Sequence, residues 1–134
     1  MRNIKYILIN ETPSENRARR PNARRDRNLG YHYIVTSECV VRNPIDIRQV
    51  GTFMPAPVCG QDDLNHCSIG ILYQGELNPE FWNLKQREAL FGLLVDLRSQ
   101  FPDAKILGVS EYDRHQIKVN DAMNALRFEL SNEP

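Results

Sequence analysis

Three features that direct many proteins to a partner are missing from this 134-residue sequence. Seventeen basic and seventeen acidic residues give a formal net charge of zero, so no overall field attracts the chain to nucleic acid or anionic lipid. No apolar run approaches the ~20 residues that a membrane-spanning helix needs. The apolar core of the N-terminal segment, Tyr6–Ile9, is too short for a signal peptide. The sequence as written predicts a cytoplasmic protein with neither a nucleic-acid nor a membrane partner.

The sequence also lacks a disulfide pattern. It contains three cysteines, Cys39, Cys59 and Cys67, which is an odd number without a CxxC pair. We therefore expect reduced thiols, while an oxidising compartment would permit one bridge between Cys59 and Cys67.

The order of the predicted elements is typical of an α/β domain. Short apolar runs predict three buried strands, Ile4–Asn10, Ser68–Tyr73 and Ala104–Val109, and an alternating pattern predicts a hairpin of Tyr31–Thr36 with Cys39–Arg42. Helical periodicity predicts one helix from the N-cap Asn83 to Phe101 and another over Val119–Leu130, and capping signals predict a short helix between Thr12 and Pro21. Because the chain contains no repeat and no linker, we expect one domain over residues 1–134, with a central mixed β-sheet flanked by helices.

A cluster of six arginines lies between residues 17 and 27. Such a run is typical of a solvated loop. The alternative is a rim that binds anions, in which Arg20, Arg24 and Arg25 contact carboxylates or phosphates.

Several segments occur in the order characteristic of one enzyme family. They are GYHYIV (30–35), VGTF (50–53), NHCSIGILYQG (65–75), QREALFGLLVDLRSQFPDAKILG (86–108) and KVND (118–121). Together they resemble the zinc-dependent N-acetylmuramoyl-L-alanine amidases of the phage-lysozyme and peptidoglycan-recognition type, over nearly the whole chain. The resemblance implies the amidase fold and a cell-wall ligand, because that family cuts the amide between the lactyl group of muramic acid and the L-alanine of the stem peptide.

The resemblance also locates the family's metal ligands. The zinc polarises the scissile carbonyl and activates a water, for which it needs three protein ligands. The corresponding positions are Asn10, Val109 and Asn120, and none of these is an ordinary zinc ligand. Phe53 replaces a histidine that the family often carries in its pocket. We therefore predict no metal and no cofactor, although the family would imply zinc.

Two family positions keep their residue type. Tyr31 stands where the resemblance implies a tyrosine lining the reaction site, and Lys118 where it implies a lysine that stabilises the oxyanion. The alternative is a packed Tyr31 with a satisfied hydroxyl and a surface charge at Lys118. Without an activated water, these two residues are not expected to hydrolyse an amide.

The resemblance further implies a ligand groove beside these positions. We assign to the groove Asn10, His32, Phe53, Asn65, His66, Val109, Glu111 and Asn120. Simpler roles remain open: a turn at Asn10, a helix N-cap at Asn120, a core position at Val109 and a structural role for His66. A relocated zinc site among His32, His66, His115, Cys59, Cys67, Glu111 and Asp113 is not favoured, because strand geometry would place His66 and Cys67 on opposite faces.

Three hypotheses about function follow. The first is a degenerate amidase domain that binds a peptidoglycan fragment, a muropeptide or a related anionic peptide without zinc-dependent cleavage. The second is an active amidase with a relocated metal, and the third is an interaction module for a protein partner. A cell-wall ligand conflicts with a cytoplasmic location, unless the protein is released by lysis or a leader has been removed, which would permit extracellular or periplasmic action.

Overall fold

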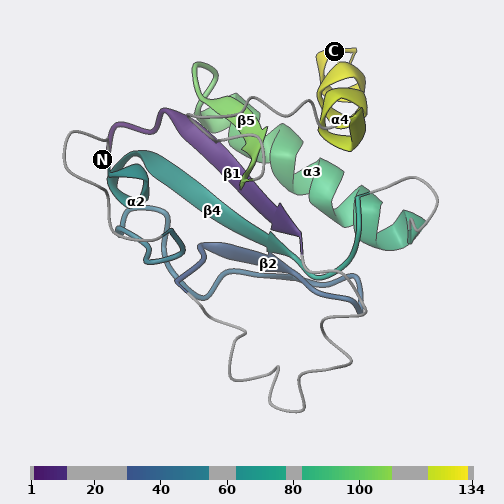
Figure 1. Cartoon of the computed structure of the whole chain (residues 1–134), viewed down its shortest axis with the longest axis horizontal. Helices are drawn as coiled ribbons and strands as arrows, with labels where there is room; N and C mark the ends of the chain where they lie inside the picture. The colour runs from purple at the N-terminus through teal and green to yellow at the C-terminus, as the bar shows by residue number, and fades with distance from the viewer. Residues whose placement is uncertain (1, 12–29, 55–62, 78–82, 110–120, 133–134) are drawn as a thin grey trace.

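The computed structural model describes residues 2–11, 30–54, 63–77, 83–109 and 121–132. These residues form one five-stranded sheet and three helices (Figure 1). The elements in chain order are β1 (Tyr6–Glu11), β2 (Tyr33–Val35), β3 (Val41–Arg42), α2 (Leu64–Cys67), β4 (Ser68–Tyr73), α3 (Leu84–Gln100), β5 (Lys105–Gly108) and α4 (Asp121–Ser131).

The sheet is mixed, as the sequence predicts, with the strand order β3-β2-β4-β1-β5. Strand β1 lies between β4 and β5 and runs parallel to both, and β2 runs parallel to β4 on its other side. The predicted hairpin is confirmed, because β2 and β3 pair antiparallel at the edge. The connection between them contains Cys39, whose φ of 69° lies in the left-handed region.

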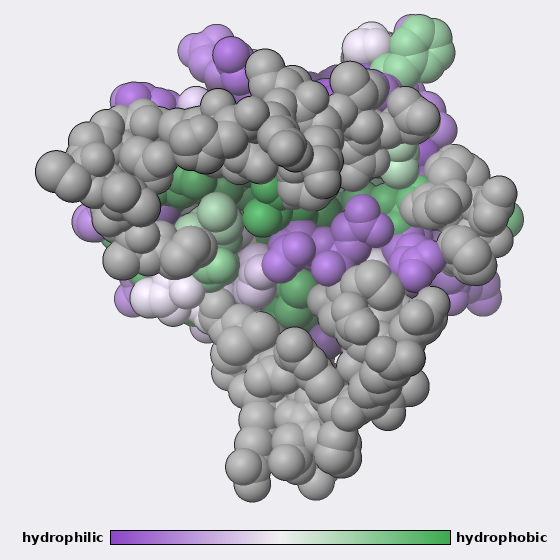
Figure 2. Space-filling model, in the orientation of Figure 1, coloured by the Kyte–Doolittle hydropathy of each residue, from purple (hydrophilic) through white to green (hydrophobic). Residues whose placement is uncertain are grey.

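Alternate residues of the central strands face two different layers. On one face, Ile7 and Ile9 of β1 and Ile69 and Ile71 of β4 join the main core with α3 and α4. We call the opposite side of the sheet the second face. There Ile34 and Leu72 form a smaller cluster with Tyr31. Figure 2 views the molecule from the side away from α3, and apolar surface is visible there between the segments drawn in grey.

Helix α3 begins and ends where the sequence predicts. The side chain of Asn83 caps it by accepting a hydrogen bond from the N–H of Gln86 at 3.2 Å. The helix ends at Gln100, directly before Phe101 and Pro102. The periodicity that predicts this helix corresponds to an apolar stripe: Leu90, Leu93, Leu94 and Leu97 are buried in the main core, and Phe101 packs against it. Burial of each leucine contributes about 1.5–3 kcal/mol to the hydrophobic stabilisation of this layer.

Gln86 has a role that the capping pattern does not reveal. Its side chain is buried, and its Nε2 donates to the carbonyl oxygens of Val35, Thr36 and Gln74 at 3.3, 2.9 and 2.8 Å. One side chain of α3 therefore satisfies backbone groups at the ends of both β2 and β4, and links the helix to the sheet.

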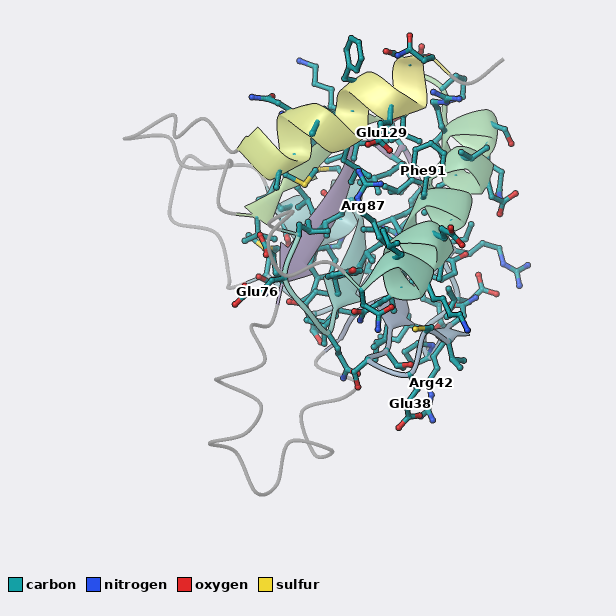
Figure 3. The ribbon with its side chains drawn as sticks, turned by 90° about the vertical axis from the view of Figure 1, so that its right-hand side faces the viewer. Glu38, Arg42, Glu76, Arg87, Phe91 and Glu129 are labelled. Carbon is teal, nitrogen blue, oxygen red and sulfur yellow. The ribbon has the colours of Figure 1, made fainter. Side chains whose placement is uncertain are left out.

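Helix α4 is attached to α3 and β5 by arginine side chains. Arg87 of α3 and Glu129 of α4 point toward one another (Figure 3) and form two hydrogen bonds of 2.9 Å. Two further contacts join Arg98 to the carbonyl oxygen of Leu130 and Arg127 to that of Ile106. The buried face of α4 consists of Met123, Leu126 and Leu130.

Some predicted features lie outside the described residues. These are the short helix between Thr12 and Pro21, the arginine cluster and Cys59. Within the described part of the chain, no helix has the length and apolar character needed to cross a membrane.

Candidate functional site

Asn10 and Tyr31 form a hydrogen-bonded pair on the second face of the sheet. Asn10 lies near the carboxyl end of β1, and its Nδ2 donates to the hydroxyl oxygen of Tyr31 at 2.7 Å. Tyr31 precedes β2, whereas β4 separates β2 from β1. The tyrosine side chain therefore crosses β4, where it packs with Leu72, to reach the asparagine. The fold brings together two residues that the sequence assigned to the site separately.

The environment of Tyr31 keeps its hydroxyl neutral. The residue is 3% exposed, and burial raises the pKa of the hydroxyl, an effect that the hydrogen bond from Asn10 partly opposes. The tyrosine is thus a packed aromatic residue with a satisfied hydroxyl, which was the simpler of the two roles considered for it.

Phe53 forms the apolar wall beside this pair. Its ring stacks on that of Tyr31, with centroids 5.4 Å apart and planes inclined by 28°, and it contacts the ring of His32 edge-on at 5.9 Å. The ring also lies directly against the backbone of Gly70 in β4, because a Cβ atom added there would be 2.6 Å from the ring carbons. Only glycine leaves enough room for this contact.

Asn65 holds the loop that carries Phe53. Its Oδ1 accepts a hydrogen bond from the N–H of Met54 at 3.0 Å, and its Nδ2 donates to the carbonyl oxygen of Met54 at 2.9 Å. The sequence analysis placed Asn65 in the groove lining. Its carboxamide is instead used to fix the backbone next to Phe53.

The segment Asn65–Cys67 is a helical turn, and the expectation that it has strand geometry is wrong. It belongs to α2, whose N-cap Asp63 accepts a hydrogen bond from the N–H of Asn65. His66 is exposed, and its Nε2 lies 3.2 Å from Oδ2 of Asp63. The argument that alternation places His66 and Cys67 on opposite faces of a strand therefore does not apply. The chain turns here because an aspartate caps it, a local signal that was present in the sequence.

His32 supports the site from behind. The sequence analysis assigned it to the groove, but the residue is completely buried. Its Nδ1 accepts a hydrogen bond from the N–H of Gly70 at 3.0 Å, and its Nε2 lies 2.7 Å from the carbonyl oxygen of Gln49. Both ring nitrogens are thus engaged by the backbone, and His32 connects β4 to the loop that leads to Phe53.

Arg2 is a structural residue that the sequence analysis missed. Its guanidinium donates to the carbonyl oxygens of Ile47, Asn65, His66 and Ser68, at distances from 2.7 to 3.2 Å. These contacts join the N-terminal segment to the end of α2 and to the loop after β3. A cation is favourable at the C-terminus of a helix, so the position of Arg2 could have been expected from α2. The sequence analysis did not predict α2, and the role of Arg2 was therefore missed.

The side chains at the first two positions that the resemblance assigns to zinc ligands do not fit a zinc ion. Residues Ile9 and Gly108 are the last pair in the register of the parallel strands β1 and β5; Asn10 follows Ile9 within β1, and Val109 directly follows the end of β5. Valine offers no donor atom, and an asparagine amide is a poor ligand for zinc. In the described part of the chain, no three or more His, Cys, Asp or Glu side chains are grouped so that they could hold a metal ion.

Several predicted site residues lie outside the described residues. These are Lys118, Asn120, Glu111, the arginines Arg20, Arg24 and Arg25, and the alternative ligands Cys59, Asp113 and His115. Val109 directly follows β5 and is partly buried.

Comparison with known proteins identifies the family. The family model described as N-acetylmuramoyl-L-alanine amidase matches residues 1–124, so this chain belongs to that family. Among curated proteins, none matches the sequence.

Two solved structures show the same fold. One is the endolysine N-acetylmuramoyl-L-alanine amidase LysCS from Clostridium intestinale URNW, with 18% identity, a TM-score of 0.66 and coverage of 98% of this chain and 86% of that one. The other is the N-acetylmuramoyl-L-alanine amidase LysC from the same organism, with 17% identity, a TM-score of 0.65 and coverage of 98% and 87%. At this identity the likeness concerns the fold.

Proposed function

We propose that this protein is a degenerate amidase domain that binds muropeptides without cleaving them by the family's zinc mechanism. Membership of the amidase family supports a peptidoglycan fragment as the ligand. One observation supports the proposed loss of the zinc mechanism. At two of the positions that the resemblance assigns to zinc ligands, Asn10 offers only a poor zinc ligand, the oxygen of its amide, and Val109 offers no donor atom.

The ligand binds on the second face of the sheet, beside Asn10 and Phe53. The partly exposed ring of Phe53 suits apolar groups of the ligand, such as the lactyl and alanine methyl groups. The carboxylates of the stem peptide meet Arg20, Arg24 and Arg25. Because this part of the interaction is electrostatic, affinity falls as salt concentration rises.

The proposal is tested with a synthetic muramoyl peptide, which is N-acetylmuramic acid carrying its stem peptide. The protein is equilibrated with zinc and desalted, and its metal content is measured by elemental analysis. Binding of the muramoyl peptide is measured by calorimetry, and release of the free stem peptide is followed by mass spectrometry. We expect binding, no stoichiometric zinc and no release.

Two results would contradict the proposal in different ways. Stoichiometric zinc together with release of stem peptide would identify an active amidase with ligands elsewhere in the chain. Absence of binding would remove the muropeptide as ligand and leave a protein partner as the alternative. The triple variant Arg20→Gln, Arg24→Gln, Arg25→Gln tests the basic rim, and it should weaken binding mainly at low salt.

A further inference from the structure

Within this protein, one asparagine already binds both polar groups of a single backbone residue. The carboxamide of Asn65 donates to the carbonyl oxygen of Met54 and accepts from its N–H, at 2.9 and 3.0 Å. A carboxamide can do this because it carries a donor and an acceptor side by side. A second asparagine whose carboxamide is not fully hydrogen-bonded could bind the N–H and C=O of one residue of a peptide in the same way.

Asn10 has such unused groups. One hydrogen of its Nδ2 is donated to the hydroxyl of Tyr31. The described residues contain no further partner for its second Nδ2 hydrogen or for its Oδ1. The residue is only partly buried, whereas its neighbours Leu8 and Ile9 in β1 are almost completely buried. A ligand on the second face can therefore reach a donor and an acceptor on one side chain.

The side chain of Asn10 is held in place by Tyr31. Tyr31 is 3% exposed and its ring is stacked on Phe53, so the position of its hydroxyl, which accepts from the amide nitrogen of Asn10, is fixed by packing. Since the side chain of Asn10 has this partner before a ligand arrives, less side-chain entropy remains to be lost on binding.

The pair is neutral, and this selects the kind of ligand group. A carboxylate could accept from the single remaining N–H of Asn10, but it would then face Oδ1, which is also an acceptor. The backbone of an extended peptide presents the N–H and the C=O of one residue on the same side, as in an antiparallel ladder. This pattern complements both groups of Asn10.

We propose that Asn10 binds the N–H and C=O of one residue of an extended peptide ligand, with Tyr31 as its positioning residue. The proposal rests on the proposed function and deepens it, since it names the part of a muropeptide that is bound at the former metal position. At the former metal position, this protein binds the peptide backbone, whereas the family's enzymes polarise the scissile carbonyl.

The experiment combines changes in the ligand with changes in the protein. A series of muramoyl peptides is prepared in which one backbone amide at a time is N-methylated, which removes one N–H. Affinities are measured by calorimetry for the wild type and for Asn10→Ala, Asn10→Asp and Tyr31→Phe. Asn3→Ala is the matched control, because Asn3 is an exposed asparagine just before β1.

In the wild type, we expect N-methylation at one position to weaken binding about tenfold, as loss of one hydrogen bond does. Asn10→Ala should weaken binding of the unmodified peptide by a similar factor or more. N-methylation at that position should not weaken the binding of this variant any further. Asn10→Asp keeps the size of the side chain but loses the N–H donor, and so weakens binding even if Asn10→Ala folds poorly. Tyr31→Phe should reduce the response to N-methylation, while Asn3→Ala should behave as the wild type.

The outcomes separate this inference from the proposed function. Binding of the unmodified peptide that is unchanged in both Asn10 variants would overturn the inference and leave the proposed function intact. The same holds if Asn10→Ala keeps the full response to N-methylation. If the wild type does not bind the unmodified muramoyl peptide, both proposals are wrong.

Discussion

The N–H of Gly70 donates a hydrogen bond to Nδ1 of His32, at 3.0 Å in the interior of the protein. An Nδ1 that accepts a hydrogen bond carries no proton, so the proton of the neutral ring is on Nε2 and is donated to the carbonyl oxygen of Gln49. The guanidinium of Arg2 lies 3.1 Å from the same Nε2, which disfavours a charged ring. The fold therefore requires His32 to be neutral.

This requirement predicts that stability decreases in mild acid. Burial lowers the pKa of His32 below its ordinary value of 6.5. The hydrogen bond to Gln49 partly opposes this shift, and the charge of Arg2 adds to it. Between the lowered pKa and 6.5 the unfolded chain binds a proton that the folded protein does not. Stability is therefore complete above about pH 6.5 and falls as the pH decreases below it. Urea denaturation at intervals from pH 8 to pH 5 measures the effect.

The exposed histidine of α2 provides the control for this prediction. His66→Asn should keep the acid sensitivity, because His66 lies on the surface. In His32→Asn the slope between pH 5 and pH 6.5 should be smaller. An unchanged slope in His32→Asn would show that another group is responsible.

Gly70→Ala should destabilise the protein by about 1–3 kcal/mol, because the new methyl group would overlap the ring of Phe53. The double variant Gly70→Ala, Phe53→Ala should lose less free energy of unfolding than the sum of the two single changes, since the overlap is absent from it. Additive losses would mean that the two residues are not in contact. Chemical denaturation of the four proteins gives the coupling free energy.

Gly92→Ala is the matched change at a position with free space. Gly92 is exposed within α3, and a Cβ atom added there would have no neighbour within 4 Å. Because glycine is a poor helix former, alanine should increase the free energy of unfolding by about 0.5–1 kcal/mol. A loss of stability in this variant would indicate that the outer face of α3 is covered.

Gln86→Leu should cost about 2–4 kcal/mol of stability. The leucine keeps the apolar stem but leaves the carbonyl oxygens of Val35, Thr36 and Gln74 without this donor. Thermal and urea denaturation measure the loss. Gln100→Leu, an exposed change at the end of the same helix, should alter stability by less than about 0.5 kcal/mol.

Glu129→Gln should destabilise the docking of α4 by about 0.5–1 kcal/mol. The ion pair with Arg87 is bidentate, but the side chain of Glu129 is 44% exposed and solvent screens part of the attraction. Glu88→Gln removes the same charge from an exposed position of α3 and should have a smaller effect. Equal losses in the two variants would show that the pair with Arg87 contributes nothing specific.

The local elements of this protein could be predicted because their signals lie within a few residues. Continuous apolar runs formed β1, β4 and β5, and a polar cap followed by a leucine stripe formed α3. The order of these elements indicated the mixed α/β fold, and the resemblance of several segments to one family indicated the family, which the family model over residues 1–124 confirms. The capping aspartate of α2 was also a local signal, but it was overlooked because the apolar strand that follows dominates the pattern.

The roles of the site residues were harder to predict, because each depends on a partner distant in the sequence. His32 and Asn65 were assigned to a groove, yet one is buried against Gly70 and the other holds Met54. Both are polar side chains next to buried strands. Whether such a side chain faces a ligand or satisfies the protein's own backbone depends on which loop is packed against it.

The sequence by itself determined which segments become strands and helices, because these are properties of neighbouring residues. Only the tertiary structure decided that Tyr31 meets Asn10. Strand β4 comes later in the chain than both residues but lies between their strands in the sheet, so the contact forms only when β4 inserts between β1 and β2. The order of strands in a sheet is set by packing of the whole core, and no local pattern encodes it.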